Sequence, residues 1–185
     1  MTKKLLHNIK AYGVELHIVD VTNLITLRHW RNQPEIRSKM ENDSYITPHQ
    51  HRMWYENHVM KSNNGYWIVK YKNTSVGYIQ IKIDEITNTV ESGSFLVDSP
   101  VRNALLAISL VLIQYDIAFY VVKAKKSIVK IRNNNLRAIR FSKQFGYIED
   151  SVSEEFSSYT LCYEDYSKAK QRFTKFFTDT DLTII

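Results

Sequence analysis

Cysteine, glycine and proline are scarce in this chain of 185 residues, which has 1 cysteine, 5 glycines and 3 prolines. The single thiol, Cys162, excludes a disulfide within the chain and a zinc site built from several thiolates. Because Cys162 lies in a segment of alternating character, 159–163, we expect a small buried side chain there rather than a nucleophile. The shortage of glycine and proline favours regular elements joined by short loops. We predict no metal site.

A long uninterrupted hydrophobic run is also missing. The segment 1–10 contains lysines but no apolar run behind them, which is unlike a signal peptide or a membrane anchor. The most apolar stretch, 104–122, is interrupted by Gln114 and Asp116, so we interpret it as a buried helix rather than a membrane span. We therefore expect a cytoplasmic protein without a membrane partner.

Acidic residues are absent between Ile117 and Ile148, and the whole chain carries a net charge of +6. Such a segment can bind phosphates of any origin, and a solvated basic surface is the alternative explanation. A nucleic-acid partner would rest on this cluster alone, and we do not expect one. The segment contains eight basic residues: Lys123, Lys125, Lys126, Lys130, Arg132, Arg137, Arg140 and Lys143.

The chain does contain enough apolar sequence for one globular domain. Hydrophobic residues make up 44% and charged residues 24%, which indicates a substantial core and little disorder. We treat residues 1–185 as a single domain, with a core over 14–164 and a C-terminal helix and tail over 165–185. Alternation and turn signals predict strands over 14–21, 66–71, 76–83, 90–97, 127–132, 147–150 and 156–163. Caps and periodicity predict helices over 24–31, 34–40, 48–60, 100–122, 136–145 and 166–177.

This order of elements predicts an α/β (α+β) fold. Three strands joined by the turns KNTS and DEITN form an antiparallel meander, and a strand–helix–strand crossover follows it. The expected result is a mixed, mostly antiparallel central sheet of about seven strands flanked by helices.

Five segments follow one another in the chain: LRHWRNQPEIRSKM, ITPHQHRMWY, YWIVKYKNTSVGYIQI, ESGSFLVD and NLRAIRFSKQFGY. In this order and spacing they resemble the GNAT superfamily of acyl-CoA-dependent N-acyltransferases, over about residues 14–150. Singly, each motif is weak. The first two are similar to one branch of the superfamily. That branch includes the amino-sugar nucleotide N-acetyltransferase of pseudaminic acid biosynthesis and the ribosomal-protein N-terminal acetyltransferases.

The resemblance implies acetyl-CoA, or another acyl-CoA, as the cofactor. Its pantetheine arm would lie where the fourth and fifth strands splay apart, and main-chain groups there would polarise the thioester carbonyl. Its pyrophosphate would lie at the start of the next helix, where main-chain N–H groups and the helix dipole favour an anion. The residues implied in cofactor binding are Phe95, Leu96, Val97, Arg102, Asn103, Ala104, Leu105, Leu106, Ala107, Asn135, Ala138 and Ser142.

Two of these positions depart from the family pattern. Leu105 replaces a glycine of the phosphate-binding turn, and its side chain would crowd the approaching phosphate. Ser142 replaces a tyrosine that commonly protonates the departing thiolate, and a serine hydroxyl is a much poorer acid. Asn135 is equally suited to cap the helix that follows it. These departures keep a second hypothesis open, in which the chain is a catalytically weak or inactive binding module of the same fold.

On the acceptor side, the resemblance implies Glu91 as the general base and His51 as the competing base. An ordinary exposed strand residue is the alternative for Glu91. Arg31 could clamp a diphosphate, although a salt bridge to Glu35 at helical spacing would also explain it. The residues implied in substrate binding are Arg31, Asn32, Met40, His51, Trp54 and Gln80.

We therefore expect an N-acetyltransferase that acts on a primary amine, specifically that of a nucleotide-linked amino sugar in surface-glycan biosynthesis. The segment WRN, together with the downstream His51 and Trp54, favours a sugar-nucleotide acceptor over a ribosomal protein. A protein N-terminus or another small amine is the alternative acceptor. The C-terminal tail could dock on its own domain or on a second subunit, so a homodimer stays open.

Overall fold

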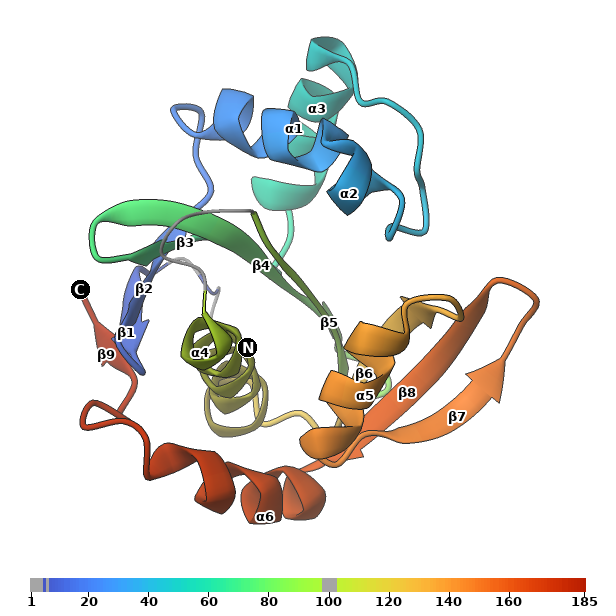
Figure 1. Cartoon of the computed structure of the whole chain (residues 1–185). Coiled ribbons are helices and arrows are strands. Elements are labelled where there is room, and N and C mark those ends of the chain that lie inside the picture. The colour runs from blue at the N-terminus through green and yellow to red at the C-terminus, as the bar shows by residue number, and fades with distance from the viewer. Residues whose placement is uncertain (1–4, 6, 98–102) are drawn as a thin grey trace.

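The computed structural model of the chain describes residues 5, 7–97 and 103–185. Its centre is one sheet of nine strands with helices on both faces (Figure 1). The strands are β1 (Ile9–Ala11), β2 (Val14–Ile18), β3 (Gly65–Tyr71), β4 (Thr74–Asp84), β5 (Thr89–Leu96), β6 (Lys126–Arg132), β7 (Ile148–Val152), β8 (Phe156–Cys162) and β9 (Thr183–Ile184). They lie in the order β7-β8-β6-β5-β4-β3-β2-β1-β9. β5 and β6 run parallel, whereas the other neighbouring strands that the structure describes run antiparallel. The predicted class, a mixed and mostly antiparallel sheet flanked by helices, is therefore confirmed.

The helices cover the two faces unequally. They are α1 (Leu24–Asn32), α2 (Pro34–Arg37), α3 (Pro48–Trp54), α4 (Ala104–Asp116), α5 (Leu136–Gln144) and α6 (Tyr163–Thr174). α3 and α4 each continue into a π-helical turn, η1 (Tyr55–Val59) and η2 (Ile117–Val121). Figure 1 shows α1, α2 and α3 on one face of the sheet, whereas α4 lies within the curve of the other face with α6 beyond it.

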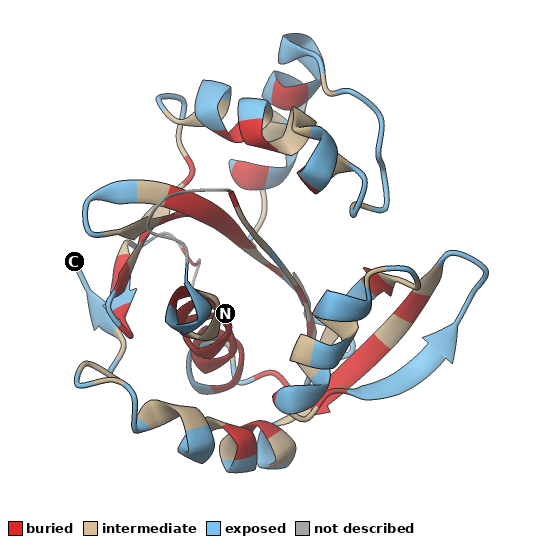
Figure 2. Cartoon of the chain, viewed as in Figure 1, coloured by how far each residue is buried: buried red, intermediate tan, exposed pale blue. Residues whose placement is uncertain are grey.

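Each face of the sheet has its own hydrophobic cluster, because successive side chains of a strand point to opposite faces. Ile79 and Ile81 of β4 belong to the cluster around α4, whereas Tyr78 next to Ile79 belongs to the cluster beneath α1. The α4 cluster includes Leu112 and Ile113, both 0% exposed, and Figure 2 shows α4 and the middle strands as largely buried. We call the two sides the α4 face and the α1 face.

Local sequence signals place several helix ends as predicted. The Thr47 side chain caps α3 by accepting from the Gln50 N–H at 3.2 Å, and the Gln50 side chain bonds back to the Thr47 N–H. The Asn135 side chain caps α5 by accepting from the Ala138 N–H at 3.3 Å. Gly146 follows α5 with φ +97°, a conformation that favours glycine.

The sheet has nine strands rather than the predicted seven or so, because two strands are too short to be recognised by alternation of polar and apolar residues. β1 and β9 have 3 and 2 residues, too few to show a period of two. They pair with each other, with Ile9 opposite Ile184. The C-terminal tail therefore docks on the edge of its own domain.

Several predicted helix boundaries differ from the structure by three or four residues, including the end of the last helix at Thr174 instead of 177. The helix predicted over 34–40 ends at Arg37, because the chain turns there into an irregular loop. The last helix begins at Tyr163 and not at Tyr166, since β8 ends directly before it. The apolar helix begins at Ala104, and its predicted start at residue 100 lies outside the described residues.

By length and composition, α4 with η2 could cross a membrane, with a mean hydropathy of 1.9 over Ala104–Val121. However, 67% of this stretch is buried inside the domain. We therefore interpret it as a core helix, in agreement with the sequence analysis.

A buried carboxylate joins three parts of the fold. Asp116, at the end of α4, is 2% exposed and accepts hydrogen bonds from the hydroxyls of Tyr12 and Tyr166. The Lys170 ammonium lies 2.8 Å from the Asp116 carboxylate. A buried charge is tolerated when it is paired and hydrogen-bonded. This network therefore holds α6 and the turn between β1 and β2 against α4.

Replacing Lys170 by Met should lower the free energy of unfolding by about 3 kcal/mol, because Asp116 would be left as an unpaired buried charge. Urea unfolding followed by circular dichroism measures the change. The matched control is Lys168→Met, since Lys168 is 81% exposed and lies 3.9 Å from Asp165. That variant should change stability by less than about 0.5 kcal/mol. Equal losses in the two variants would contradict this account of the network.

Candidate functional site

β5 and β6 pair over a short stretch and then part. Thr89 lies opposite Lys126 and Glu91 lies opposite Ile128. Beyond these residues, β5 stays paired with β4 on one side, and β6 stays paired with β8 on the other. The described strands thus leave a gap in main-chain pairing between residues 92–96 and 129–132. We call it the strand gap, with its closed end at Glu91.

Buried hydroxyl groups fix the closed end of the strand gap. The Ser92 and Ser127 Oγ atoms lie 2.8 Å apart, and Ser127 Oγ lies 2.8 Å from the Tyr147 hydroxyl. Burial raises the pKa of Tyr147 well above its usual range, so this group stays a neutral hydrogen-bonding partner. The chain of hydroxyls joins β5 to β6 on the α4 face at the point where the ladder stops.

The edge of β5 that faces the strand gap carries the main-chain groups of Ser94 and Leu96. The Val97 N–H donates to the Val76 carbonyl oxygen at 2.9 Å, so the main chain of Val97 faces β4. Alternation gives Phe95 the same orientation and turns Ser94 and Leu96 the other way. Of the three residues predicted to form the edge, Leu96 therefore faces the gap, whereas Phe95 and Val97 contribute side chains to the α1-face cluster. Ser94 was not among the predicted residues, although the alternation of side chains along the strand contains the signal for it.

The first turn of α4 follows the end of β5, and the predicted Arg102 lies outside the described residues. Asn103 caps the helix, with its Oδ1 accepting from the Leu106 N–H at 2.9 Å. Leu105 is 47% exposed, so its side chain lies outside the core, on the same turn as the N–H groups that an anion would use. Crowding of an anion by Leu105 therefore stays a prediction. The remaining predicted residues here are exposed Ala104, buried Leu106 and half-buried Ala107.

Three further predicted residues lie at or on α5, which follows β6 at the far side of the strand gap (Figure 1). The Asn135 side chain is engaged as the cap of α5. Ala138 packs against the α4-face cluster, and Ser142 is half-buried. Contact between these residues and a cofactor stays a prediction.

Glu91 lies at the closed end of the strand gap and points to the α1 face. Its carboxylate forms an ion pair with the Lys82 ammonium at 2.8 Å, and its side chain is 44% exposed. A carboxylate at this place could take a proton from an ammonium group that approaches over the α1 face. The geometry thus brings Glu91 to the gap, and its role as a base stays a prediction.

Gln80 lies in the middle of the α1 face of the sheet. Its Oε1 accepts from the Tyr78 hydroxyl at 3.2 Å. A Cβ atom at position 93 would lie 2.9 Å from the Gln80 Nε2, so Gly93 leaves the space that the amide occupies. The rings of Tyr78 and Phe95 are 5.3 Å apart on the same face. Gln80 is therefore on the same face as Glu91 and an aromatic pair, as a substrate contact would require.

His51 and Trp54 pack within the layer formed by α1 and α3. His51 is 5% exposed and its ring stacks on Trp54, with centroids 5.0 Å apart. Burial, followed by the positive charges of Arg28 and Arg31, lowers the pKa of His51 to about 4. A histidine with this pKa is too weak a base to deprotonate an ammonium group at neutral pH. The geometry therefore gives His51 a packing role and argues against it as the competing base.

Arg31 carries a buried N–H group without a partner. Within the part of the chain that the structure describes, its Nη1 atom makes no hydrogen bond, and the salt bridge to Glu35 that was the alternative explanation for Arg31 is not formed. Burial lowers the pKa of Arg31, and its interaction with Tyr78 opposes that shift. The Oε1 atom of Gln33 is likewise buried and unpartnered. Orphaned buried polar atoms are rare and commonly mark the place of a water, an ion or a ligand.

Asn32 and Met40 shape the loop between α2 and α3. The Asn32 amide donates to the Ile46 carbonyl at 2.9 Å and accepts from the Ile46 N–H at 2.8 Å. Its amide thus holds the loop rather than presenting itself to a substrate. The Met40 side chain packs against the α1-face cluster, as an apolar substrate contact would require.

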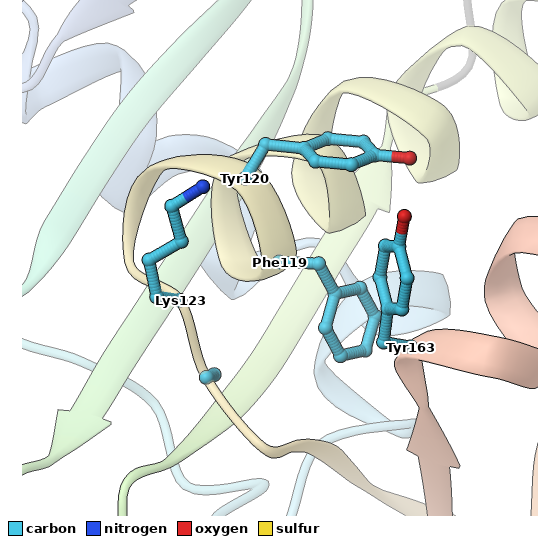
Figure 3. A pocket seen from close by; sticks show the side chains of 5 residues that line it. Phe119, Tyr120, Lys123 and Tyr163 are labelled. Carbon is cyan, nitrogen blue, oxygen red and sulfur yellow. The ribbon is translucent and has the colours of Figure 1, made fainter.

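A cavity of about 260 Å³ lies elsewhere, at the other end of α4 (Figure 3). Because α4 rises about 1.5 Å per residue, this end is about 20 Å from its N-terminus. In Figure 3 the hydroxyl of Tyr163 points toward that of Tyr120, and the two rings meet edge-on with centroids 5.8 Å apart. The cavity is lined by none of the predicted site residues. Its lining consists of Phe119, Tyr120, Lys123, Ala124 and Tyr163.

The model of the acetyltransferase (GNAT) family matches residues 24–147, from α1 through α5. The chain belongs to this family. GNAT enzymes use acetyl-CoA, so the protein is an acetyl-CoA-dependent N-acetyltransferase. No curated protein matches its sequence.

Solved structures share the GNAT fold at low sequence identity. Spermidine N-acetyltransferase from Vibrio cholerae, in complex with CoA and spermine, is 14% identical with a TM-score of 0.76, over 84% of this chain and 98% of that chain. FdhC, described as a nucleotide-linked sugar GNAT, is 18% identical with a TM-score of 0.77, over 92% and 98%. A putative acetyltransferase from T. thermophilus is 16% identical with a TM-score of 0.74, over 91% and 96%.

The strand gap fits the cofactor of a GNAT enzyme. The pantetheine arm contains amide groups, and a free strand edge at Ser94 and Leu96 can pair with amides as it would with a further strand. The N-terminus of α4 adds main-chain donors for a phosphate group. These residues of the chain would hold acetyl-CoA with its thioester toward the closed end of the gap.

Replacing Leu105 by Gly should tighten acetyl-CoA binding severalfold, because it removes the side chain beside the N–H groups of α4. Glycine near a helix start should also cost about 1 kcal/mol of stability. Isothermal titration calorimetry measures the affinity, with Leu105→Ala as the control that shortens the side chain and keeps the helix propensity. Weaker binding in the Gly variant than in the wild type would contradict the crowding argument.

Acid should destabilise the protein through His51. Its pKa is about 4 in the fold, below the usual value of about 6.5 for an unfolded chain, so the unfolded state binds more protons between these values. Stability is then highest above pH 6.5 and falls by about 2 kcal/mol as the pH is lowered to 5. His51→Gln should lose this component of the pH dependence in urea titrations. His49→Gln, on the exposed side of α3, should keep it, and equal profiles for the two variants would refute the assignment.

Proposed function

We propose that this acetyltransferase acetylates an amino group of a nucleotide-linked sugar. The observation that carries the proposal is the half-buried Arg31 on the α1 face, which forms no ion pair in the described structure and whose Nη1 atom is buried without a hydrogen-bond partner. A diphosphate would give this group the acceptors that it lacks, through charge-assisted hydrogen bonds.

The charge around Arg31 favours an anionic acceptor over a cationic one. Arg28 and Arg31 lie one helical turn apart on α1, and both act on the neutral His51 ring. A polyamine brings further positive charges, which these two arginines repel in a partly buried setting. The aromatic pair of Tyr78 and Phe95 offers an apolar surface to a base or a sugar.

The comparisons support this choice only at the level of fold. FdhC is described as a nucleotide-linked sugar GNAT and the Vibrio cholerae enzyme as a spermidine N-acetyltransferase, and the chain matches both with similar TM-scores. The choice between an anionic and a cationic acceptor therefore rests on Arg31 and its surroundings.

The residues of the chain divide the work of amine acetylation. When bound, acetyl-CoA would supply the acetyl group as a thioester, so that formation of the amide C–N bond is balanced by cleavage of the C–S bond. CoA would leave as a thiolate, which takes up the second amine proton through solvent. Glu91 takes the proton that the ammonium form of the amine must lose. The N–H groups at Ser94 and Leu96 bind the donor and orient it along β5. Arg31 binds the anionic part of the acceptor, which places the amine toward Glu91.

The test is acetylation of a panel of nucleotide-linked amino sugars, with spermidine as the cationic comparison and free thiol release as the measurement. We expect turnover with at least one nucleotide-linked sugar and none above background with spermidine. Turnover with spermidine alone would contradict the proposal.

In the same assay, Arg31→Gln should raise the acceptor KM about 10-fold or more, because a charge-assisted hydrogen bond is worth about 2 kcal/mol. Its effect on kcat should be smaller. The control is Arg52→Gln, since Arg52 is 76% exposed and paired with Glu56 on α3. An unchanged KM in Arg31→Gln would remove the observation on which the proposal rests.

A further inference from the structure

The segment 38–43, which follows α2, crosses the strand gap on the α1 face. Phe95 and Arg132 lie equally far along β5 and β6 from the first pair, so they would face each other if the ladder continued. The Met40 side chain packs against the cluster that Phe95 also joins. The Met40 carbonyl oxygen accepts from the Arg132 Nε at 3.0 Å. Met40 therefore links Arg132 of β6 to the α1-face cluster, against which Phe95 of β5 also packs. We call 38–43 the strap.

Arg132 is the main anchor of the strap. Its side chain is 15% exposed, with ion pairs to Asp43 at 3.7 Å and to Glu155 at 3.0 Å. Lys130, two residues earlier on the same face of β6, pairs with Glu41 at 3.3 Å. Because Glu155 belongs to the turn between β7 and β8, Arg132 joins this turn and the strap at one point. A guanidinium can bond several acceptors in fixed directions, which suits this arrangement.

The strap is also held at its other end. The loop that continues from the strap is fixed by the two hydrogen bonds between Asn32 and Ile46, and Thr47 then caps α3. The exposed pair of Lys130 and Glu41 contributes little by itself, since such pairs are screened by water and salt. Arg132 has three polar contacts, and its guanidinium also lies over the Phe156 ring, 4.7 Å from the ring centroid. It is therefore the group whose loss would release the strap from β6.

We propose that Arg132 is a positioning residue that sets acceptor specificity by holding the strap across the α1 face of the strand gap. The strap, α1 and the β4–β5 surface then bound the acceptor side, so a discrete small amine fits and a polypeptide lying across the gap does not. This inference deepens the proposed function and rests on an acceptor that binds over the α1 face.

The first test is the kinetics of Arg132→Gln with the amine that the wild type acetylates best. The acceptor KM should rise about 10-fold with kcat changed less than about threefold, because the residue holds the site without touching the reacting atoms. Short peptides with a free N-terminus should become detectable acceptors. Arg132→Lys keeps the positive charge but not the directional hydrogen bonds, so its acceptor KM should lie between those of the wild type and Arg132→Gln.

The second test needs no activity. Trypsin cleavage after Lys39, an exposed residue of the strap, should be about 10-fold faster in Arg132→Gln than in the wild type, because a released segment opens more often. The matched control in both tests is Arg137→Gln on the exposed side of α5, which makes the same charge change and should leave cleavage and KM unchanged.

The outcomes separate this inference from the proposed function. If a small amine other than a nucleotide-linked sugar is the acceptor, the proposed function fails, and the KM split with that amine still tests Arg132. Unchanged cleavage in Arg132→Gln overturns the inference, and so does faster cleavage with an unchanged acceptor KM. Efficient acetylation of peptides by the wild type also overturns it.

Discussion

The parting of β5 from β6 is the constraint on which the rest of the site depends. Main-chain polar groups in a protein need partners, and each of these strands satisfies one side of its backbone with a different neighbour. The Ser92–Ser127 hydrogen bond holds the strands together where pairing stops. Beyond this bond, the main-chain groups of Ser94 and Leu96 are not paired with β6, so the amide groups of a pantetheine arm could hydrogen-bond to them as a further strand would. In the proposed mechanism, an acetyl group delivered along this edge of β5 would reach the closed end, where Glu91 lies.

The charged groups on the two faces of the sheet differ in whether their buried atoms have hydrogen-bond partners. On the α4 face, Asp116 is paired with Lys170 and accepts bonds from two tyrosines, so the network is complete and serves stability. On the α1 face, half-buried Arg31 has a buried Nη1 atom without a partner, and burial beside two arginines lowers the pKa of His51 to about 4. A buried N–H group without a hydrogen-bond partner, as at Arg31, lowers the stability of the fold, whereas the paired Asp116 does not. In the proposed function, an anionic acceptor bound at Arg31 would remove that cost.

Local patterns predicted much of the fold and part of the site. The cap at Thr47 and the end of α5 at Gly146 depend on neighbouring residues, and both were predicted. Features formed between distant segments were not: β9 pairs with β1 across the whole chain, and the Arg132–Met40 bond joins residues 92 positions apart. The environment of His51 is another such case, because burial between helices and two arginines set its pKa.

A crystal structure of the protein with CoA tests the central claim most directly. The account predicts a pantetheine arm in the strand gap, hydrogen-bonded to the main chain of Ser94 and Leu96, with the sulfur toward Glu91. CoA bound outside the gap, for example at the cavity lined by Phe119 and Tyr120, would contradict it. A gap filled by side chains, with no CoA bound at saturating concentration, would contradict it equally.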